Sequence, residues 1–205
     1  CVRMLRRHIQ ALGYKNDFSI YDETDQLNIV KSCLKELSLD DKAYSPRSVL
    51  SRISYAKNHG ISPEDFYSQS YDSKSERMAV LYSHYEKRLK SSAALDFDDL
   101  LLKAVLLLSQ EPTICELLNH QYEYILVDEY QDTNRVQYQL IRLLTQIRQN
   151  LCVVGDEDQS IYGWRGADIQ NILSFEQDYP TARIIKLEQN YRSTQAILDA
   201  AGAVV

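Results

Sequence analysis

The hydrophobic pattern changes near residue 120, and this change constrains the fold more than any other feature of the sequence. Before it, apolar residues recur at helical spacing in segments bounded by capping and turn residues. After it, short apolar runs alternate with helical patterns; the runs are 124–129, 150–156 and 182–190, and the helical patterns are 135–147, 167–179 and 193–202. Such alternation is typical of a parallel sheet covered by helices. We predict a nearly all-α part followed by an α/β part, with the boundary between residues 92 and 120.

Start and stop signals predict the individual helices. Gly13 ends the first helix, Asp22 caps the second, Ser45-Pro46 opens the third, and Ser193 is predicted to cap the last. The helices predicted before the boundary cover 1–12, 22–37, 46–60, 73–91, 96–109 and 112–119, with a strand-like run at 18–21. The helix at 73–91 is the longest, and its spacing predicts one apolar face, formed by Met78, Leu81, Tyr82, Tyr85 and Leu89.

The composition excludes several classes of protein. The longest apolar runs fall far short of the ~20 residues of a membrane span. The four cysteines are widely spaced and form no CxxC pair, which argues against structural zinc and against a disulfide framework, and which fits a reducing cytosol. A net charge of −6 argues against a general polyanion binder, although Arg3, Arg6, Arg7 and His8 cluster at the start. That cluster also suits a solvated helix face.

Acidic side chains follow the first apolar run directly. Asp128 and Glu129 end the run, and ligands of parallel sheets gather at the carboxyl ends of the strands. Nucleotide hydrolysis uses such a pair, because one carboxylate holds Mg²⁺ and the next polarises the attacking water. The alternative is structural, since acids also cap the N–H groups of a following helix.

Two further strand ends carry polar side chains of different chemistry. After the second run comes Gln159, which can donate to and accept from a phosphate or its attacking water, and then Tyr162, Trp164 and Arg165 on a loop containing two glycines. Aromatic rings beside a cation suit the stacking of single-stranded bases, although Trp164 could instead be a core residue. After the third run, Arg192 is a candidate cation for a γ-phosphate.

Three long motifs in this order resemble motifs II, III and IV of superfamily 1 DNA helicases of the UvrD/Rep/PcrA type. They read "ILVDEYQDTN" (125–134), "VVGDEDQSIYGWRGAD" (153–168) and "LEQNYRS" (187–193). "LDFDDLL" (95–101) resembles the short acidic motif that these proteins carry before motif II, and the opening helix resembles the one after their motif Ia. The resemblance covers essentially the whole chain.

The resemblance implies an α/β fold, namely an incomplete RecA-like P-loop NTPase parallel sheet with an inserted all-α subdomain. Residues 1–13 would be a helix of the first RecA-like domain and 14–92 its inserted helical subdomain. Residues 93–187 would continue the first domain, and 188–205 would begin the second. The implied activity is that of a 3′→5′ translocase that couples ATP hydrolysis to movement on single-stranded DNA.

The resemblance also implies roles for single residues. Asp128 would hold Mg²⁺, Glu129 would be the catalytic base and Gln159 would sense the γ-phosphate of ATP. Tyr191 would pack on adenine and Arg192 would reach the γ-phosphate. The DNA contacts would come from Tyr162, Trp164 and Arg165. The implied partners are single-stranded DNA and single-strand/double-strand junctions, with repair or replication proteins, in a cytoplasmic location associated with the nucleoid and without a membrane.

The sequence contains no GxxxxGK[ST] pattern for the phosphate-cradling loop. We therefore expect that loop upstream of Cys1 in a longer protein, and we expect the 205 residues alone to be inactive. Without the strand that precedes this loop, the two central strands could pair directly, leave an open groove or dimerise.

Two alternative functions stay open at this point. One is a metal-dependent nuclease, with a two-metal site drawn from six acids, Asp96, Asp98, Asp99, Asp128, Glu129 and Asp132. The other is a non-catalytic module that binds DNA or protein.

Overall fold

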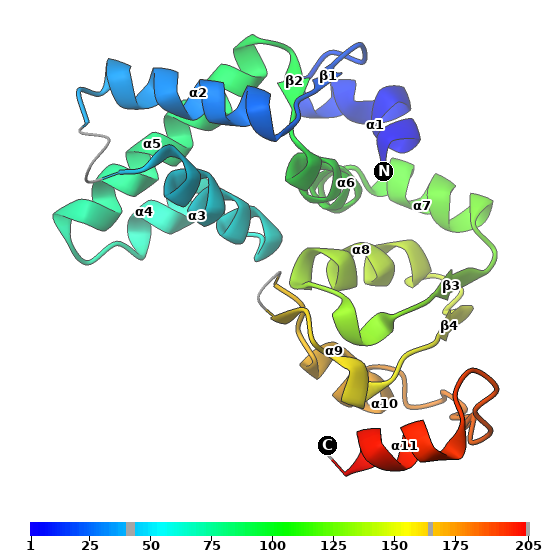
Figure 1. Ribbon diagram of the computed structural model, residues 1–205. Helices are drawn as coiled ribbons and strands as arrows, with labels where there is room; N and C mark the ends of the chain where they lie inside the picture. Colours follow the sequence, from blue (N-terminus) through cyan, green and yellow to red (C-terminus); the bar gives the residue numbers. More distant parts are fainter. Residues whose placement is uncertain (40–43, 164–165, 204–205) are drawn as a thin grey trace.

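A computed structural model describes residues 1–39, 44–163 and 166–203 of the chain. The described part is mostly helical and contains two small parallel sheets (Figure 1). The helices are α1 (Val2–His8), α2 (Glu23–Glu36), α3 (Pro46–Asn58), α4 (Pro63–Ser68), α5 (Ser73–Ser91), α6 (Phe97–Gln110), α7 (Pro112–Gln121), α8 (Arg135–Thr145), α9 (Gln170–Leu173), α10 (Phe175–Asp178) and α11 (Gln195–Gly202). The strands are β1 (Ser19–Ile20), β2 (Ala94–Leu95), β3 (Ile125–Val127) and β4 (Leu151–Val153), and the 3₁₀ turns are η1 (Ile9–Leu12), η2 (Tyr130–Asp132) and η3 (Glu157–Gln159).

The predicted helix starts of the first part are confirmed by their capping bonds. The side chain of Asp22 accepts a hydrogen bond from the amide of Asp25 at 2.9 Å, and Ser45 caps α3 with Pro46 in its first turn. Gly13 follows η1 with a φ of 73°, a left-handed conformation that glycine adopts without strain. Polar caps therefore set the helix boundaries where the sequence indicated them.

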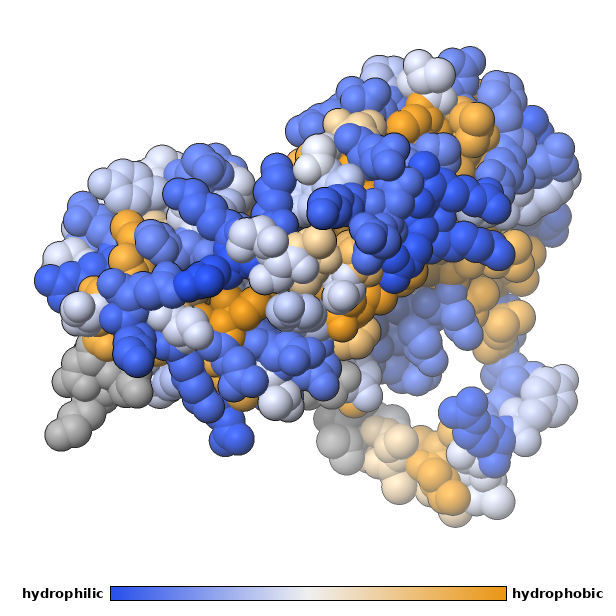
Figure 2. Space-filling model, turned by 90° about the horizontal axis from the view of Figure 1, so that it is seen from above, coloured by the Kyte–Doolittle hydropathy of each residue, from blue (hydrophilic) through white to orange (hydrophobic). Residues whose placement is uncertain are grey.

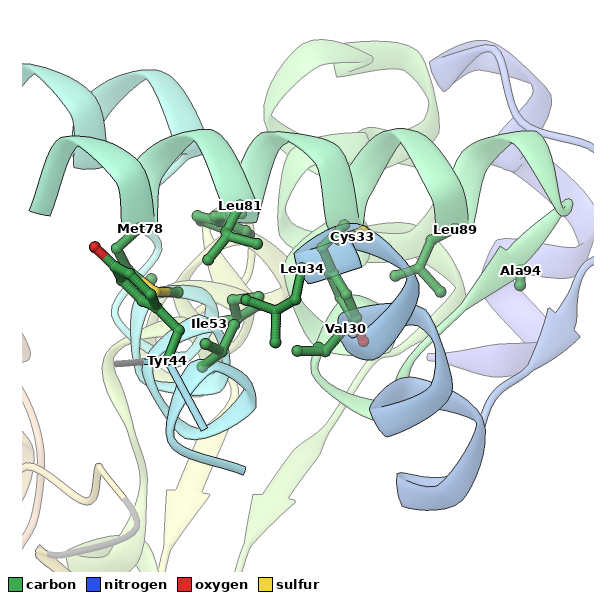
Figure 3. Close-up of a cluster of buried hydrophobic side chains, with 13 residues drawn as sticks. Val30, Cys33, Leu34, Tyr44, Ile53, Met78, Leu81, Leu89 and Ala94 are labelled. Carbon is green, nitrogen blue, oxygen red and sulfur yellow. The ribbon is translucent and has the colours of Figure 1, made fainter. Parts of the chain in front are cut away.

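One hydrophobic core lies among α2, α3 and α5. The apolar face predicted for the long helix is buried, and it packs against Val30, Cys33 and Leu34 of α2 and against Ile53 of α3 (Figure 3). These helices lie on the opposite side of α6 from α7 in Figure 1. Residues 23–91 thus form a helical unit with an interior of its own.

A second core is built from α1, α6 and α7, and leucines of α8 pack against it. The short strand β2 lies between the two cores, because Ala94 belongs to the first and Leu95 to the second. Successive side chains of a strand point to opposite faces. β2 pairs with β1 in parallel, with Ser19 opposite Ala94, so this two-stranded sheet joins the two cores.

The strands β3 and β4 pair directly and in parallel, with Leu126 opposite Cys152. This outcome is the first of the three that we considered for the central strands. Both of these residues are exposed, Leu126 at 76%, so one face of the pair is open. Figure 1 shows α8 between α6 and the segment that carries α9 and α10.

Three expectations for the last third of the chain are wrong. Residues 182–190 form neither helix nor strand; Ile184, Ile185 and Leu187 are exposed, and no described strand pairs with them. The helix predicted at 167–179 is split into α9 and α10 at Ser174. Thr194, and not Ser193, is the N-cap residue of α11, and it makes no side-chain capping bond.

The surface of the molecule is largely hydrophilic where Figure 2 shows it, with hydrophobic residues in small separate groups. Within the described ranges, no helix combines the length and the apolar character needed to cross a bilayer. All four cysteines are free thiols.

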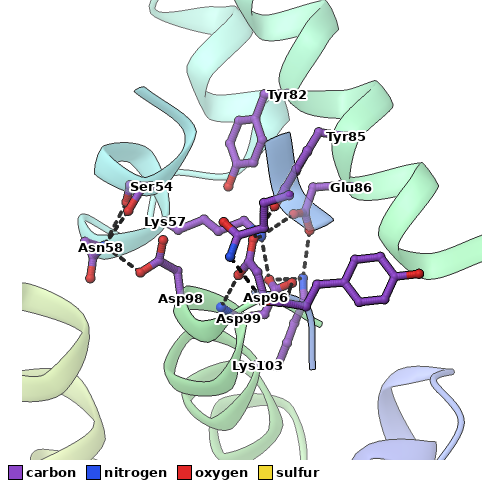
Figure 4. Close-up of polar contacts among 12 residues, drawn as sticks. Ser54, Lys57, Asn58, Tyr82, Tyr85, Glu86, Asp96, Asp98, Asp99 and Lys103 are labelled. Carbon is purple, nitrogen blue, oxygen red and sulfur yellow. Dashed lines mark hydrogen bonds and ion pairs between the residues drawn. The ribbon is translucent and has the colours of Figure 1, made fainter. Parts of the chain in front are cut away.

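A buried lysine ties the helical unit to α6. The Lys57 ammonium group at the end of α3 is fully buried and contacts three carboxylates, Glu86 at 2.6 Å, Asp96 at 2.7 Å and Asp99 at 2.9 Å (Figure 4). Lys103 adds a second cation 3.1 Å from Glu86. Glu86 belongs to α5, while Asp96 caps α6. One network therefore joins α3, α5 and α6.

Burial and the neighbouring charged side chains shift the pKa values of this network in opposite directions. Burial by itself would lower the pKa of Lys57, but Asp99, Asp96 and Glu86 outweigh it and raise that pKa well above its ordinary value. Desolvation raises the pKa of Asp96 to about 6 despite the neighbouring lysine. Lys57 is therefore charged at neutral pH. Because its pKa is higher in the folded chain, its stabilising effect is complete below its ordinary pKa and is lost only as the pH rises through the raised value.

Lys57→Met should lower the free energy of unfolding at pH 7 by about 3–5 kcal/mol, because it leaves buried carboxylates without a cation. The loss should shrink between pH 7 and pH 5, where protonation of Asp96, whose pKa burial raises to about 6, removes buried negative charge. Urea unfolding at both pH values measures this. Lys87→Met, an exposed lysine on α5, is the control and should change stability by less than about 0.5 kcal/mol. Wild-type stability of Lys57→Met at pH 7 would contradict the account.

Candidate functional site

The strand β3 ends in two exposed carboxylates, as the sequence predicted. The Oδ1 atom of Asp128 accepts a hydrogen bond from the amide of Glu129 at 2.9 Å. Glu129 has φ 50° and ψ 44°, a left-handed conformation that is uncommon outside glycine. Strained backbone of this kind is often found at functional sites. An exposed carboxylate at a strand end also fits Mg²⁺, which binds one or two carboxylates and keeps several of its waters.

The Glu129 carboxylate is held by a buried amide that the sequence analysis did not single out. Nε2 of Gln131 donates to Oε2 of Glu129 at 2.8 Å, and Gln131 is 1% exposed. Its Oε1 accepts a hydrogen bond from the amide of Asp156 at 3.1 Å. Gln131 thus connects the acids after β3 with the loop after β4.

The loop after β4 approaches this amide closely. A Cβ on Gly155 would lie 2.7 Å from Oε1 of Gln131 and 2.9 Å from Cδ1 of Ile172, so only glycine fits there. In the same loop Nε2 of Gln159 donates to Oδ2 of Asp156 at 2.6 Å. The structure therefore brings the segment of Gln159 to that of Glu129, as the sequence predicted for two strand ends of one sheet.

The end of α3 contacts both loops from the side of the helical unit. Nδ2 of Asn134 donates to Oδ1 of Asn58 at 2.7 Å, and Nδ2 of Asn58 donates to Oδ1 of Asp98 at 3.0 Å. A Cβ on Gly166, in the loop after β4, would lie 3.6 Å from Cε1 of His59. Asn134 also caps α8, just after the acids. The end of α3 therefore lies beside both the segment that follows the acids of β3 and the loop after β4.

The other predicted site residues belong to the segment after β4 and to the segment after the third apolar run. Tyr162 is 38% exposed and lies in the loop after β4, whereas Trp164 and Arg165 lie outside the described residues. Tyr191 is 92% exposed, and the amide of Arg192 bonds to Oδ1 of Asn190 at 2.9 Å. Among the described contacts, none joins the side chains of these last two residues to Asp128, Glu129 or Gln159. The structure does not bring the third motif to the first two.

Three of the six acids proposed for a two-metal nuclease site are bonded to residues at the end of α3. Asp96 and Asp99 pair with the buried Lys57, and Asp98 accepts from Asn58. Within the described ranges there is no group of three or more side chains arranged to hold a metal ion. With these three acids bonded elsewhere and no such group present, the described residues do not support a two-metal nuclease site. A hollow of about 490 Å³ lies between α6, α8 and the end of α10, and no predicted site residue lines it.

Comparison with known proteins identifies the family. The model of the UvrD/REP helicase N-terminal domain matches residues 1–180. The chain belongs to the UvrD/REP helicase family. It is 51% identical over 205 residues to the ATP-dependent DNA helicase PcrA of Bacillus subtilis, and 50% identical to PcrA proteins of Staphylococcus aureus and Staphylococcus epidermidis. All of this chain is covered in these matches, but it spans only 28% of the length of these relatives.

The helicase motifs predict roles for charged and aromatic residues, but they give no sign of the amides that connect the loops. Gln131 stands between a tyrosine and an aspartate in the first motif, and nothing in its spacing shows that its side chain faces the second loop. Asn134 was detectable as a capping residue, because Gln137 follows three positions later and completes a capping box. The contact from Asn58 spans 76 positions and has no local signal.

Proposed function

We propose that this chain is part of an ATP-dependent DNA helicase that moves 3′→5′ on single-stranded DNA. The observation that carries the proposal is the pair Asp128 and Glu129 at the end of β3, with the loop of Gln159 bonded to it through Gln131. The match to the UvrD/REP family and the similarity to ATP-dependent PcrA helicases support the same activity.

In the proposed mechanism, Asp128 would hold Mg²⁺ and Glu129 would accept the proton of the water that attacks the γ-phosphate of ATP. The bound Mg²⁺ would neutralise charge that develops on the phosphates. Gln159 would contact the γ-phosphate, Arg192 would supply a cation to it, and Tyr191 would pack on adenine. Asp128 and Glu129 are exposed to water, which leaves them accessible to a nucleotide.

The second motif would contact single-stranded DNA. Tyr162 and Trp164 would stack on bases and Arg165 would add positive charge, which suits binding without sequence preference. Junctions between single-stranded and double-stranded DNA would be substrates, and repair or replication proteins would be partners at the nucleoid, in the cytoplasm. The domains would be those described above, with 14–92 as the inserted subdomain, 93–187 in the first RecA-like domain and 188–205 in the second.

Glu129→Gln in the full-length protein should leave Mg·ATP binding nearly intact and lower DNA-stimulated turnover by about 10²–10⁴-fold. The change keeps the shape of the side chain and removes the base. Phosphate release and nucleotide titration measure the two properties. The 205-residue chain alone, which lacks a GxxxxGK[ST] sequence, should release no phosphate and serves as the negative control. Turnover of Glu129→Gln at the wild-type rate would show that Glu129 has only a structural role.

Trp164→Ala in the full-length protein should weaken binding of single-stranded DNA by about 1–3 kcal/mol, the usual effect of losing one stacking partner. The loss should be similar for oligo-dT and for mixed sequences, because every base has a π-face. Fluorescence titration of labelled oligonucleotides measures it, and Tyr162→Ala should show a smaller effect in the same direction. Unchanged affinity for both oligonucleotides would assign Trp164 to the core instead.

A further inference from the structure

We propose that Gln131 is a positioning residue for the hydrolysis step: its side chain orients the Glu129 carboxylate and couples it to the loop after β4. The inference rests on the proposed ATPase function. The Gln131 amide would not contact the reacting atoms itself. It would act through the Glu129 carboxylate.

The chemistry of its two neighbours fixes the orientation of the Gln131 amide. The backbone N–H of Asp156 can only donate, and an ionised Glu129 carboxylate can only accept. The amide therefore points its Oε1 at Asp156, at 3.1 Å, and its Nε2 at Glu129, at 2.8 Å. A glutamate at position 131 would lack the N–H donor, and a methionine there would lack both the donor and the oxygen acceptor.

Packing leaves this amide little freedom to move. The side chain is almost completely buried, and Gly155 comes so close to Oε1 that an added methyl group would clash with it. The backbone carbonyl of Gln131 also accepts from the Ser160 hydroxyl at 3.5 Å. Glu129, by contrast, is exposed, and Gln131 is its only side-chain hydrogen-bond partner among the described residues. The orientation of the base therefore depends on a rigid neighbour.

A shift of the loop after β4 would act on the side chain of the base through this contact. Asp156 donates to Gln131 from its backbone and accepts from Gln159 through its side chain. Moving the loop would either break the bond to Gln131 or carry its amide away from Glu129. A base displaced by about 1 Å can lose ~10²-fold in rate. The position of this loop would thus control hydrolysis.

The first experiment compares two isosteric changes in the full-length protein. Gln131→Glu keeps an acceptor for the Asp156 amide, but it replaces the donor to Glu129 by a second negative charge. Gln137→Glu is the matched control, because its Oε1 only accepts from the amide of Asn134 at 2.9 Å in the cap of α8. DNA-stimulated phosphate release is measured against ATP concentration and pH.

Gln131→Glu should lower kcat by about 10- to 100-fold, with little change in the KM for ATP. It should also move the acidic limb of the kcat profile to higher pH, because a nearby like charge raises the pKa of a carboxyl group. Gln137→Glu should retain the wild-type kcat and profile. A purely structural role of Gln131 would lower the amount of active protein without moving the pH profile.

A double-mutant cycle covers the case in which Gln131→Glu also impairs folding. In the Glu129→Gln background, Gln131→Glu should cause no further loss of kcat, because both changes act through the same carboxylate. Equal losses in the two backgrounds would overturn the proposal. So would a wild-type kcat and pH profile for Gln131→Glu in an active protein, which would leave the ATPase function standing. An inactive wild-type protein would overturn both.

Discussion

An ammonium group without access to water determines how the helical unit is attached to the rest of the chain. Lys57 contacts Glu86 of α5 and both Asp96 and Asp99 at the start of α6. A buried ion pair of this kind adds little net stability compared with an apolar replacement of the whole group, but removal of one partner is costly. The three helices must therefore meet in one arrangement, in which all of these charges are compensated. That requirement sets the position of the end of α3.

The arrangement at the polar loops depends on that position. Asn58 follows Lys57 directly; its side-chain amide donates to Asp98 and accepts from Asn134, which lies seven positions after the end of the short strand β3 and five after the second of its two acids. β3 and β4 contribute only three residues each and have an open face. The short sheet alone gives the acids few constraints. The amides of Gln131, buried between the loops, and of Asn58, half-buried beside them, supply the others.

Local signals explain which parts of the fold could be predicted from the sequence. The caps at Asp22 and Ser45, the left-handed Gly13 and the apolar face of α5 are encoded within a few residues of each other, and each was predicted correctly. The segment 182–190 has strand propensity, but a strand also needs a neighbour to pair with, and no described strand lies beside it. The aromatic and basic residues at 164 and 165 lie outside the described residues, so their roles stay predictions.

The sequence predicted one part of the candidate site and not the other. The order of the motifs was sufficient to place Asp128, Glu129 and Gln159 on neighbouring loops, because parallel strands end on the same edge of a sheet. Gln131 was not predictable, since its role depends on a contact with Asp156 across 25 positions. Tyr191 and Arg192 follow the segment that forms no strand, and the structure leaves them apart from the other motifs.

The helical unit holds the loops after β3 and β4 in place through the end of α3. Hydrogen–deuterium exchange of the 205-residue chain tests this most directly, with Lys57→Met compared with the wild type under conditions where both are folded. The account predicts faster exchange not only in α3 and α6 but also at residues 130–134 and 154–160, where local opening would follow the loss of the Asn58 contacts. Faster exchange confined to α3, α5 and α6, with both loops unchanged, would contradict it.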